Sequence, residues 1–169
     1  MNEMFNMDSQ ELIKQEMLQS FGEAYHAFGL SRLMGYVIAL LTFSHQPLSL
    51  DDIAAQLGRS KGPISQVTRR LLDRNLIRKV WRPNSRKDYY EIQPEIFAKA
   101  FQNNLDLIKN NTQIARQLKA QVTQTDHTNL QTLRKRLMEM QHFYELMEQH
   151  FQNFIDEWAI ERAKLYSVK

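Results

Sequence analysis

The chain has 169 residues, 43% of them hydrophobic, with a formal net charge of +3 and no cysteine. It is long enough for one ordinary domain or for one protomer of an interwoven dimer. The absence of cysteine excludes a disulfide framework, a thiolate zinc site and cysteine-based peroxide sensing, and it fits a reducing cytoplasm.

Two features argue against export or a place in a membrane. The longest apolar run, residues 33–43, is shorter than the ~20 residues that a membrane-spanning helix needs. Residues 1–8 lack the basic segment followed by an apolar segment that marks a secretory signal. We therefore expect a cytoplasmic protein without a membrane helix, and the few glycines and prolines (5 and 4) favour long helices.

The N-terminal residues predict two helices. Asp8 and Glu11 have the spacing of a capping box, which predicts a first helix over about 8–28. Its apolar stripe consists of Ile13, Met17, Phe21, Ala24 and Phe28. Gly29 ends this helix, and Ser31 is expected to cap a second helix that reaches about Ser44. The second helix is apolar on most sides, so we expect it to be central.

Residues 50–74 have the pattern of two short helices joined by a tight turn. The first helix has an apolar stripe of Leu50, Ile53, Ala54 and Leu57. Gly58 follows, where a left-handed residue is needed, and Ser60 is placed to cap the second helix, with Pro63 in its first turn. We expect Ile64, Val67 and Leu71 to face inward, which leaves Ser65, Gln66, Thr68, Arg69 and Arg70 for solvent or a ligand. This is the layout of a helix-turn-helix.

A β-hairpin is predicted directly after the second of these helices. Residues 76–82 suit a strand, 83–88 a turn and 89–92 the return strand, while the connector 46–49 offers a short strand that could pair with the hairpin. The hairpin makes the lobe a winged helix. Residues 58–88 carry a net charge of +8 and the remainder of the chain −5, a concentration that favours a polyanionic partner.

The C-terminal part predicts two long helices. One begins at Pro94, and the polar stretch 123–129 suits a turn. The second has an unbroken a/d heptad pattern made by Leu130, Leu133, Leu137, Met140, Tyr144, Met147, Phe151, Phe154 and Trp158. An antiparallel partner helix in the same chain accounts for part of this stripe. A multi-helix dimer interface is favoured because Phe143, Ile155 and Ile160 widen the stripe beyond one partner.

The predicted fold class is therefore mainly α: a winged helix-turn-helix with a small β-hairpin wing and long N- and C-terminal dimerisation helices. We expect a dimerisation helix over 1–30, a DNA-binding lobe over 31–93 and a helical dimerisation region over 94–169, all within one interwoven domain.

The candidate DNA-binding residues come from the second helix of the pair and the hairpin tip. They are Ser60, Lys61, Gly62, Ser65, Gln66, Arg69, Arg70, Arg86 and Lys87. Lys61 and the first amides of the helix suit phosphates, Gln66 can pair with adenine and Arg69 with guanine. Arg86 could enter a minor groove or contact a phosphate, and Asp88 is expected to orient Arg86 or another basic neighbour.

Four runs of sequence, residues 29–41, 50–54, 58–65 and 80–90, together resemble the GbsR-type branch of the MarR superfamily of bacterial transcriptional regulators. The resemblance covers residues 29–93. It implies a homodimer that binds double-stranded DNA at an inverted repeat, most often as a repressor, with the first, fifth and sixth helices building the dimer.

The resemblance also implies a small-molecule effector, and the GbsR-type branch is associated with choline. A box of aromatic rings could hold a quaternary ammonium by cation–π attraction. The aromatic residues expected near the junction of the dimer helices and the DNA-binding lobe are Phe21, Tyr25, Phe28, Tyr36, Phe43 and Trp81. The alternative is that these rings belong to the core, as aromatic stripes at helical spacing usually do.

No catalytic constellation is apparent in the sequence. The five histidines do not fall at metal-ligand spacings, and there is no nucleophile elbow, phosphate loop or carboxylate pair. We therefore expect no enzyme activity, metal or cofactor. The alternative function is a winged-helix module that binds protein or RNA without reading a DNA sequence.

Overall fold

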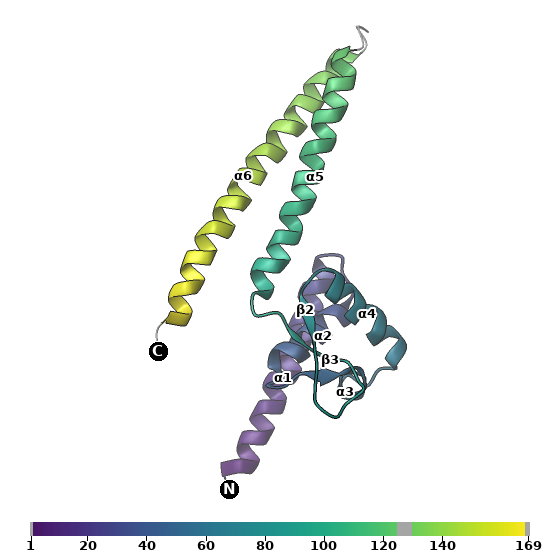
Figure 1. Cartoon of the computed structure of the whole chain (residues 1–169), viewed down its shortest axis with the longest axis vertical. Helices are drawn as coiled ribbons and strands as arrows, with labels where there is room; N and C mark the ends of the chain where they lie inside the picture. The colour runs from purple at the N-terminus through teal and green to yellow at the C-terminus, as the bar shows by residue number, and fades with distance from the viewer. Residues whose placement is uncertain (1, 125–129, 168–169) are drawn as a thin grey trace. The chain divides into compact units, whose positions relative to one another are not determined.

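The computed structural model describes residues 2–124 and 130–167, with the side chains of the first helix described from residue 9. The described residues form two compact units, 1–96 and 97–169. The elements follow in the order α1, α2, β1, α3, α4, β2, β3, α5 and α6 (Figure 1). The mainly helical fold class with a small hairpin is confirmed. None of the helices in the described ranges is both long and apolar enough to cross a membrane.

The first unit begins with α1 (Asn2–Ala27) and α2 (Arg32–Phe43). The expected start of the first helix at Asp8 is wrong, because α1 is already helical from Asn2. The second helix agrees with the prediction: the Ser31 hydroxyl accepts from the Met34 amide (3.3 Å), and α2 is buried along most of its length. Gly29 has a φ of +73° at the end of α1, as its position required.

The two helices cross at a pair of glycines that the apolar stripe did not indicate. A Cβ at Gly35 would lie 2.3 Å from the Phe21 carbonyl oxygen, and a Cβ at Gly22 would lie 2.2 Å from the Tyr36 ring. The expected stripe is therefore only partly buried, since Phe28 is 84% exposed while Gly22 is buried. Close approach of two backbones selects small residues, which a search for large apolar side chains does not find.

The rest of the first unit is the winged helix. It consists of β1 (Leu48–Ser49), α3 (Leu50–Gln56), α4 (Lys61–Asp73), β2 (Ile77–Val80) and β3 (Tyr89–Ile92). The strands form an antiparallel sheet of order β1-β3-β2, so the connector strand does pair with the hairpin, Leu48 opposite Tyr90. The centre of the core is made by Ile38, Leu40, Ile53, Ile64, Leu71 and Ile77.

The ends of α3 are fixed by short-range hydrogen bonds. At its start, Ser49 and Asp52 form a capping box in which each side chain accepts from the other residue's backbone amide (3.2 and 2.9 Å). At its end, Gly58 has a φ of +60°, and the Arg59 amide reaches back to the Ala54 carbonyl oxygen (3.0 Å). This is a Schellman motif, and it reverses the chain so that α4 begins a few residues later.

The second unit is the helix pair α5 (Ile96–Gln124) and α6 (Gln131–Ser167). Of the turn predicted at 123–129, residues 123 and 124 are helical, and residues 125–129 lie outside the described part. Buried contacts come from Leu105, Ile108, Thr112, Ala115 and Leu137, and Phe101 stacks on Phe151 with 4.5 Å between ring centroids.

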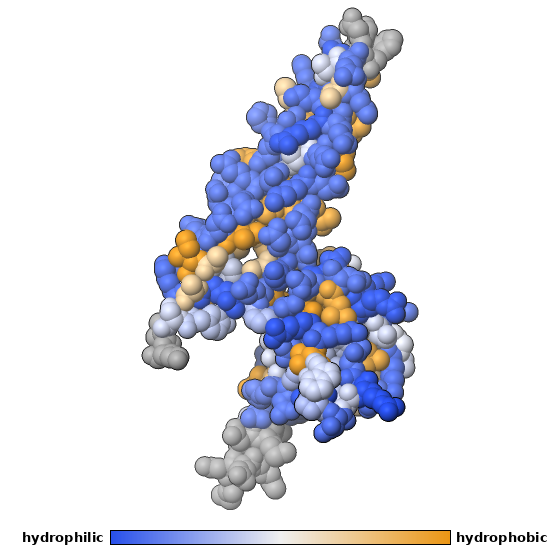
Figure 2. Space-filling view, in the orientation of Figure 1, coloured by the Kyte–Doolittle hydropathy of each residue, from blue (hydrophilic) through white to orange (hydrophobic). Residues whose placement is uncertain are grey.

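Much of the apolar surface of this helix pair is uncovered. In the heptad stripe Leu137 is buried, but Leu133 is 41% and Phe154 50% exposed. Figure 2 shows apolar side chains gathered on the visible face of the helix pair, among hydrophilic ones. Leu146 and Ile160 add to this surface, being 57% and 60% exposed.

Candidate nucleic-acid interface

Helix α4 has one buried face and one exposed polar face. Ile64, Val67 and Leu71 are buried as predicted, at 0%, 6% and 0% exposure. The opposite face carries candidate residues predicted for DNA, all exposed: Lys61, Gly62, Gln66, Arg69 and Arg70. Ser65 is half-buried beside them. The helix therefore presents a polar, basic surface on a well-packed support.

One residue of this helix is not where the sequence pattern put it. Thr68 was expected to face solvent or a ligand, but it is 1% exposed, and its hydroxyl donates to the Ser65 carbonyl oxygen (3.1 Å). Its side chain also hydrogen-bonds Tyr90 of β3. The buried face of α4 is thus wider than the apolar triplet alone, because the sheet packs on this side of the helix.

The N-terminal turn of α4 is open. Ser60 occupies the N-cap position with φ −70° and ψ 155°, but its side chain makes no capping hydrogen bond, so the expected capping by its hydroxyl is wrong. A Cβ built at Gly62 would meet no atom within 4 Å. The surface beside Gly62 is therefore unobstructed.

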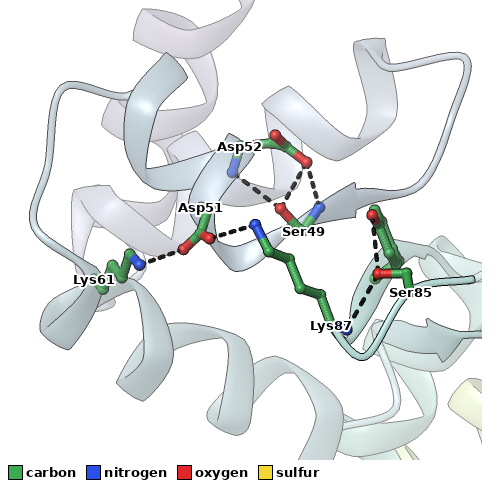
Figure 3. Close-up of polar contacts among 7 residues, drawn as sticks. Ser49, Asp51, Asp52, Lys61, Ser85 and Lys87 are labelled. Carbon is green, nitrogen blue, oxygen red and sulfur yellow. Dashed lines mark hydrogen bonds and ion pairs between the residues drawn. The ribbon is translucent and has the colours of Figure 1, made fainter.

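Two of the predicted lysines meet on one carboxylate. Lys61, at the start of α4, lies 2.6 Å from one oxygen of Asp51, and Lys87, at the hairpin tip, lies 2.7 Å from the other (Figure 3). Hydrogen bonds from both ammonium groups lower the pKa of Asp51 to about 2, and the carboxylate in turn raises the pKa of Lys87. Both lysines nonetheless remain largely exposed.

The hairpin tip is ordered by its own contacts. The Lys87 amide donates to the Ser85 hydroxyl (3.2 Å), which donates to the Tyr89 hydroxyl (3.4 Å). The Arg82 guanidinium lies 4.6 Å from the centroid of the Tyr89 ring and also donates to the Gln46 side chain (3.1 Å). These contacts fix the direction in which the tip leaves the sheet.

The acid at the end of the turn pairs with a strand residue. Asp88 lies 2.6 Å from Lys79 of β2, which raises the pKa of that lysine. Of the two roles expected for Asp88, the structure favours pairing with another basic neighbour over orienting Arg86. Arg86 itself is exposed at the tip.

The six aromatic residues predicted for an effector differ in their surroundings. Tyr36 packs over Gly22, burial raises the pKa of Tyr25, and Phe43 lines an open groove with Lys14 and Leu40. Within the described residues no ring pair joins any two of the six, and Phe28 and Trp81 are 84% and 78% exposed.

The winged helix is similar to a known protein family. Residues 41–89 match the MarR family. The matched segment runs from the end of α2 to the first residue of β3, and so contains α3, α4, β2, the hairpin tip and the Asp51 contacts. The similarity to the MarR family is thus a property of the winged-helix segment.

Two curated relatives and one solved structure are similar to this chain. YvaV, a candidate HTH-type transcriptional regulator of Bacillus subtilis strain 168, is 31% identical over 52% of this chain. The HTH-type transcriptional repressor OpcR of the same organism is 28% identical over 54%. The chain spans about half the length of both relatives (49%). The crystal structure of a transcriptional regulator has the same fold, with a TM-score of 0.74, 20% identity and coverage of 86% of this chain and 97% of the other.

Asp51 is the residue of this surface that the sequence pattern missed. It lies 10 residues before Lys61 and 36 before Lys87, so no local spacing connects the three. The only available signal was an acid that begins a helix just before a strongly basic segment, and that position is equally well explained by the helix dipole.

Proposed function

We propose that this protein is a homodimeric transcriptional regulator that binds double-stranded DNA at an inverted repeat, acts as a repressor and belongs to the GbsR-type branch. The observation that carries the proposal is the exposed polar face of α4, with Gln66 and Arg69 on it, standing on a buried apolar face and flanked by a basic hairpin tip. The match of residues 41–89 to the MarR family supports the same conclusion.

The proposed roles follow from the chemistry of each side chain. Gln66 can hydrogen-bond both edge groups of an adenine, and Arg69 those of a guanine, in a major groove. Lys61 and Lys87 are suited to phosphates, since a lysine ammonium is a flexible point charge without a preferred planar partner. Arg86 at the exposed tip is suited to the adjacent minor groove.

The uncovered apolar surface of α6 supports the homodimer. Leu146 and Ile160 are more than half exposed, and so is Phe143 at 59%. Several large apolar side chains exposed on one helix are unfavourable in water unless a partner covers them. A second copy is the partner proposed, because a two-fold dimer presents two copies of α4 to half-sites about one helical turn (~34–36 Å) apart.

The repressor role is supported by the name of OpcR, which is similar to about half of this chain. The effector rests on the resemblance to the GbsR-type branch, and we propose a quaternary ammonium such as choline. Tyr25 and Tyr36, both partly buried on the first two helices, are the rings on this chain best suited to contribute. If choline at millimolar concentration leaves the affinity for DNA unchanged, this part of the proposal is wrong.

The test is a set of binding curves on labelled duplexes. Lys61→Gln is expected to weaken binding to every duplex and to reduce the slope of log K against log salt by about 0.9. Arg69→Ala is expected to reduce discrimination between the preferred duplex and random DNA by a factor of ten or more, since a bidentate base contact contributes ~1–3 kcal/mol. Arg136→Ala, an exposed arginine on α6, is the matched control and should leave discrimination unchanged.

Binding that is equally tight to every duplex, or tighter to RNA, would overturn the proposal in favour of a winged-helix interaction module. A salt-independent Kd would have the same meaning, because contacts to phosphates release counterions.

A further inference from the structure

Asp51 connects three elements that are separate in sequence. Its carboxylate lies in the first turn of α3, and its two oxygens are within 2.7 Å of Lys61 on α4 and Lys87 on the hairpin tip. Figure 3 shows the two lysines approaching it from different elements. Within the described residues, this is the ion-pair bridge by which the tip is joined to the start of α4.

The backbone that carries this carboxylate is fixed by short-range contacts. Ser49, two residues before Asp51, and Asp52, directly after it, form the capping box at the start of the helix, and Ser49 is itself paired with Tyr89 in the sheet. Asp51 is 38% exposed, so it lies against the protein surface and is not at the end of a free chain. The two ion pairs therefore hold flexible lysine side chains at the capped start of α3.

We propose that Asp51 is a specificity-determining positioning residue, which holds the hairpin tip at a set distance from α4 and lowers the charge that the pair presents to DNA. The inference rests on the proposed function and adds to it a residue that touches no base. Its physical basis is the difference between two kinds of binding. Affinity for random DNA depends mainly on how many phosphates are neutralised, whereas discrimination depends on side chains held in one geometry against base edges.

Removal of the carboxylate should therefore change the two kinds of binding in different ways. With Asp51 present, its negative charge offsets one of the two lysine charges. Without the carboxylate, both lysine charges are uncompensated. Affinity for random duplexes then rises. Affinity for the preferred duplex gains the same charge but loses the fixed spacing between tip and helix, so the ratio of the two affinities falls.

The chain offers a matched control in Asp88. It pairs with Lys79 at 2.6 Å, as close as the contacts of Asp51, but both residues belong to the same hairpin. Asp88→Asn makes the same change in net charge within the same basic region and breaks no link between the hairpin and α4. A change in discrimination seen in Asp51→Asn and not in Asp88→Asn is thus due to the link and not to charge.

The experiment compares the full-length wild type, Asp51→Asn and Asp88→Asn on the preferred duplex and on a random one, across a salt series. Both variants should bind random DNA several-fold more tightly, with a slope of log K against log salt steeper by about 0.9. Only Asp51→Asn should reduce the affinity ratio, by about tenfold, the size of one poorly matched base pair. An unchanged ratio in Asp51→Asn, or an equal fall in Asp88→Asn, overturns the inference.

A second readout does not depend on DNA. Amide hydrogen exchange at Lys87, whose amide donates to Ser85, should be faster in Asp51→Asn than in the wild type and unchanged in Asp88→Asn. Equal exchange rates at the Lys87 amide in all three proteins contradict the positioning role. Poor folding of a variant cannot produce this result, because unfolding makes exchange faster. Wild-type protein that prefers no duplex would refute both the proposed function and this inference, whereas a selective wild type with a selective Asp51→Asn would refute the inference alone.

Discussion

Substitution of Gly35 by alanine is expected to destabilise the first unit, although alanine is the better helix former. The added Cβ would lie 2.3 Å from the Phe21 carbonyl oxygen and 2.6 Å from its carbon, whereas ordinary contacts begin at 3.4 Å. The obstacle is the backbone of α1, so the whole helix has to move away by about 1 Å. Overpacking of this kind costs ~1–3 kcal/mol, with the upper end applying to backbone obstacles.

The gain in helix propensity offsets part of this cost. Alanine is favoured over glycine inside a helix by ~1 kcal/mol. We therefore expect Gly35→Ala to lower the free energy of unfolding by about 2 kcal/mol, which corresponds to a fall in Tm of ~4–8 °C for a chain of this size. Thermal unfolding followed by circular dichroism at one fixed protein concentration measures it.

Two other glycines act as references for this measurement. Gly22→Ala meets the Tyr36 ring, a side chain that can rotate, so its effect should be smaller. Gly62→Ala adds a Cβ in open space at the start of α4 and should leave Tm unchanged or slightly raised. A Gly35→Ala protein as stable as the wild type would refute the close crossing of α1 and α2.

The other predictions concern a turn, a titration and an interface. Gly58→Ala should lower stability by ~1–2 kcal/mol in denaturant unfolding, because a φ of +60° strains any residue with a Cβ. The depressed pKa of Asp51, about 2, means that its ion pairs are complete above the ordinary value of 3.8 and are lost only as the pH falls through about 2; a carboxyl carbon titrating near 3.8 by NMR would contradict the bridge. Leu146→Glu on the exposed apolar face of α6 should yield monomers in analytical ultracentrifugation, and an intact dimer would place the interface elsewhere.

Local patterns were sufficient for the elements of the winged helix. The apolar triplet of α4, the left-handed Gly58 and the turn between β2 and β3 are each decided by residues within one or two turns of the chain. Helical periodicity and the conformational freedom of glycine act at that range. This is why the fold of the lobe agrees with the sequence.

What the sequence did not predict depends on contacts between distant residues. Thr68 is buried where its side chain hydrogen-bonds Tyr90 of β3, and Gly22 is buried because α2 crosses there. Asp51 meets Lys87 across 36 positions. The apolar stripe of α1 is only partly buried for the same reason, because the partner surface, and not the helix itself, decides which face is covered.

The central claim is that α4 and the hairpin read a DNA sequence, and selection of bound duplexes from a random pool tests it most directly. The account predicts enrichment of an inverted repeat whose half-sites are one helical turn apart, bound by two protomers and preferred over random DNA by ~10³-fold or more. Recovery of no common sequence, with salt-dependent binding of equal strength to every duplex, would contradict it.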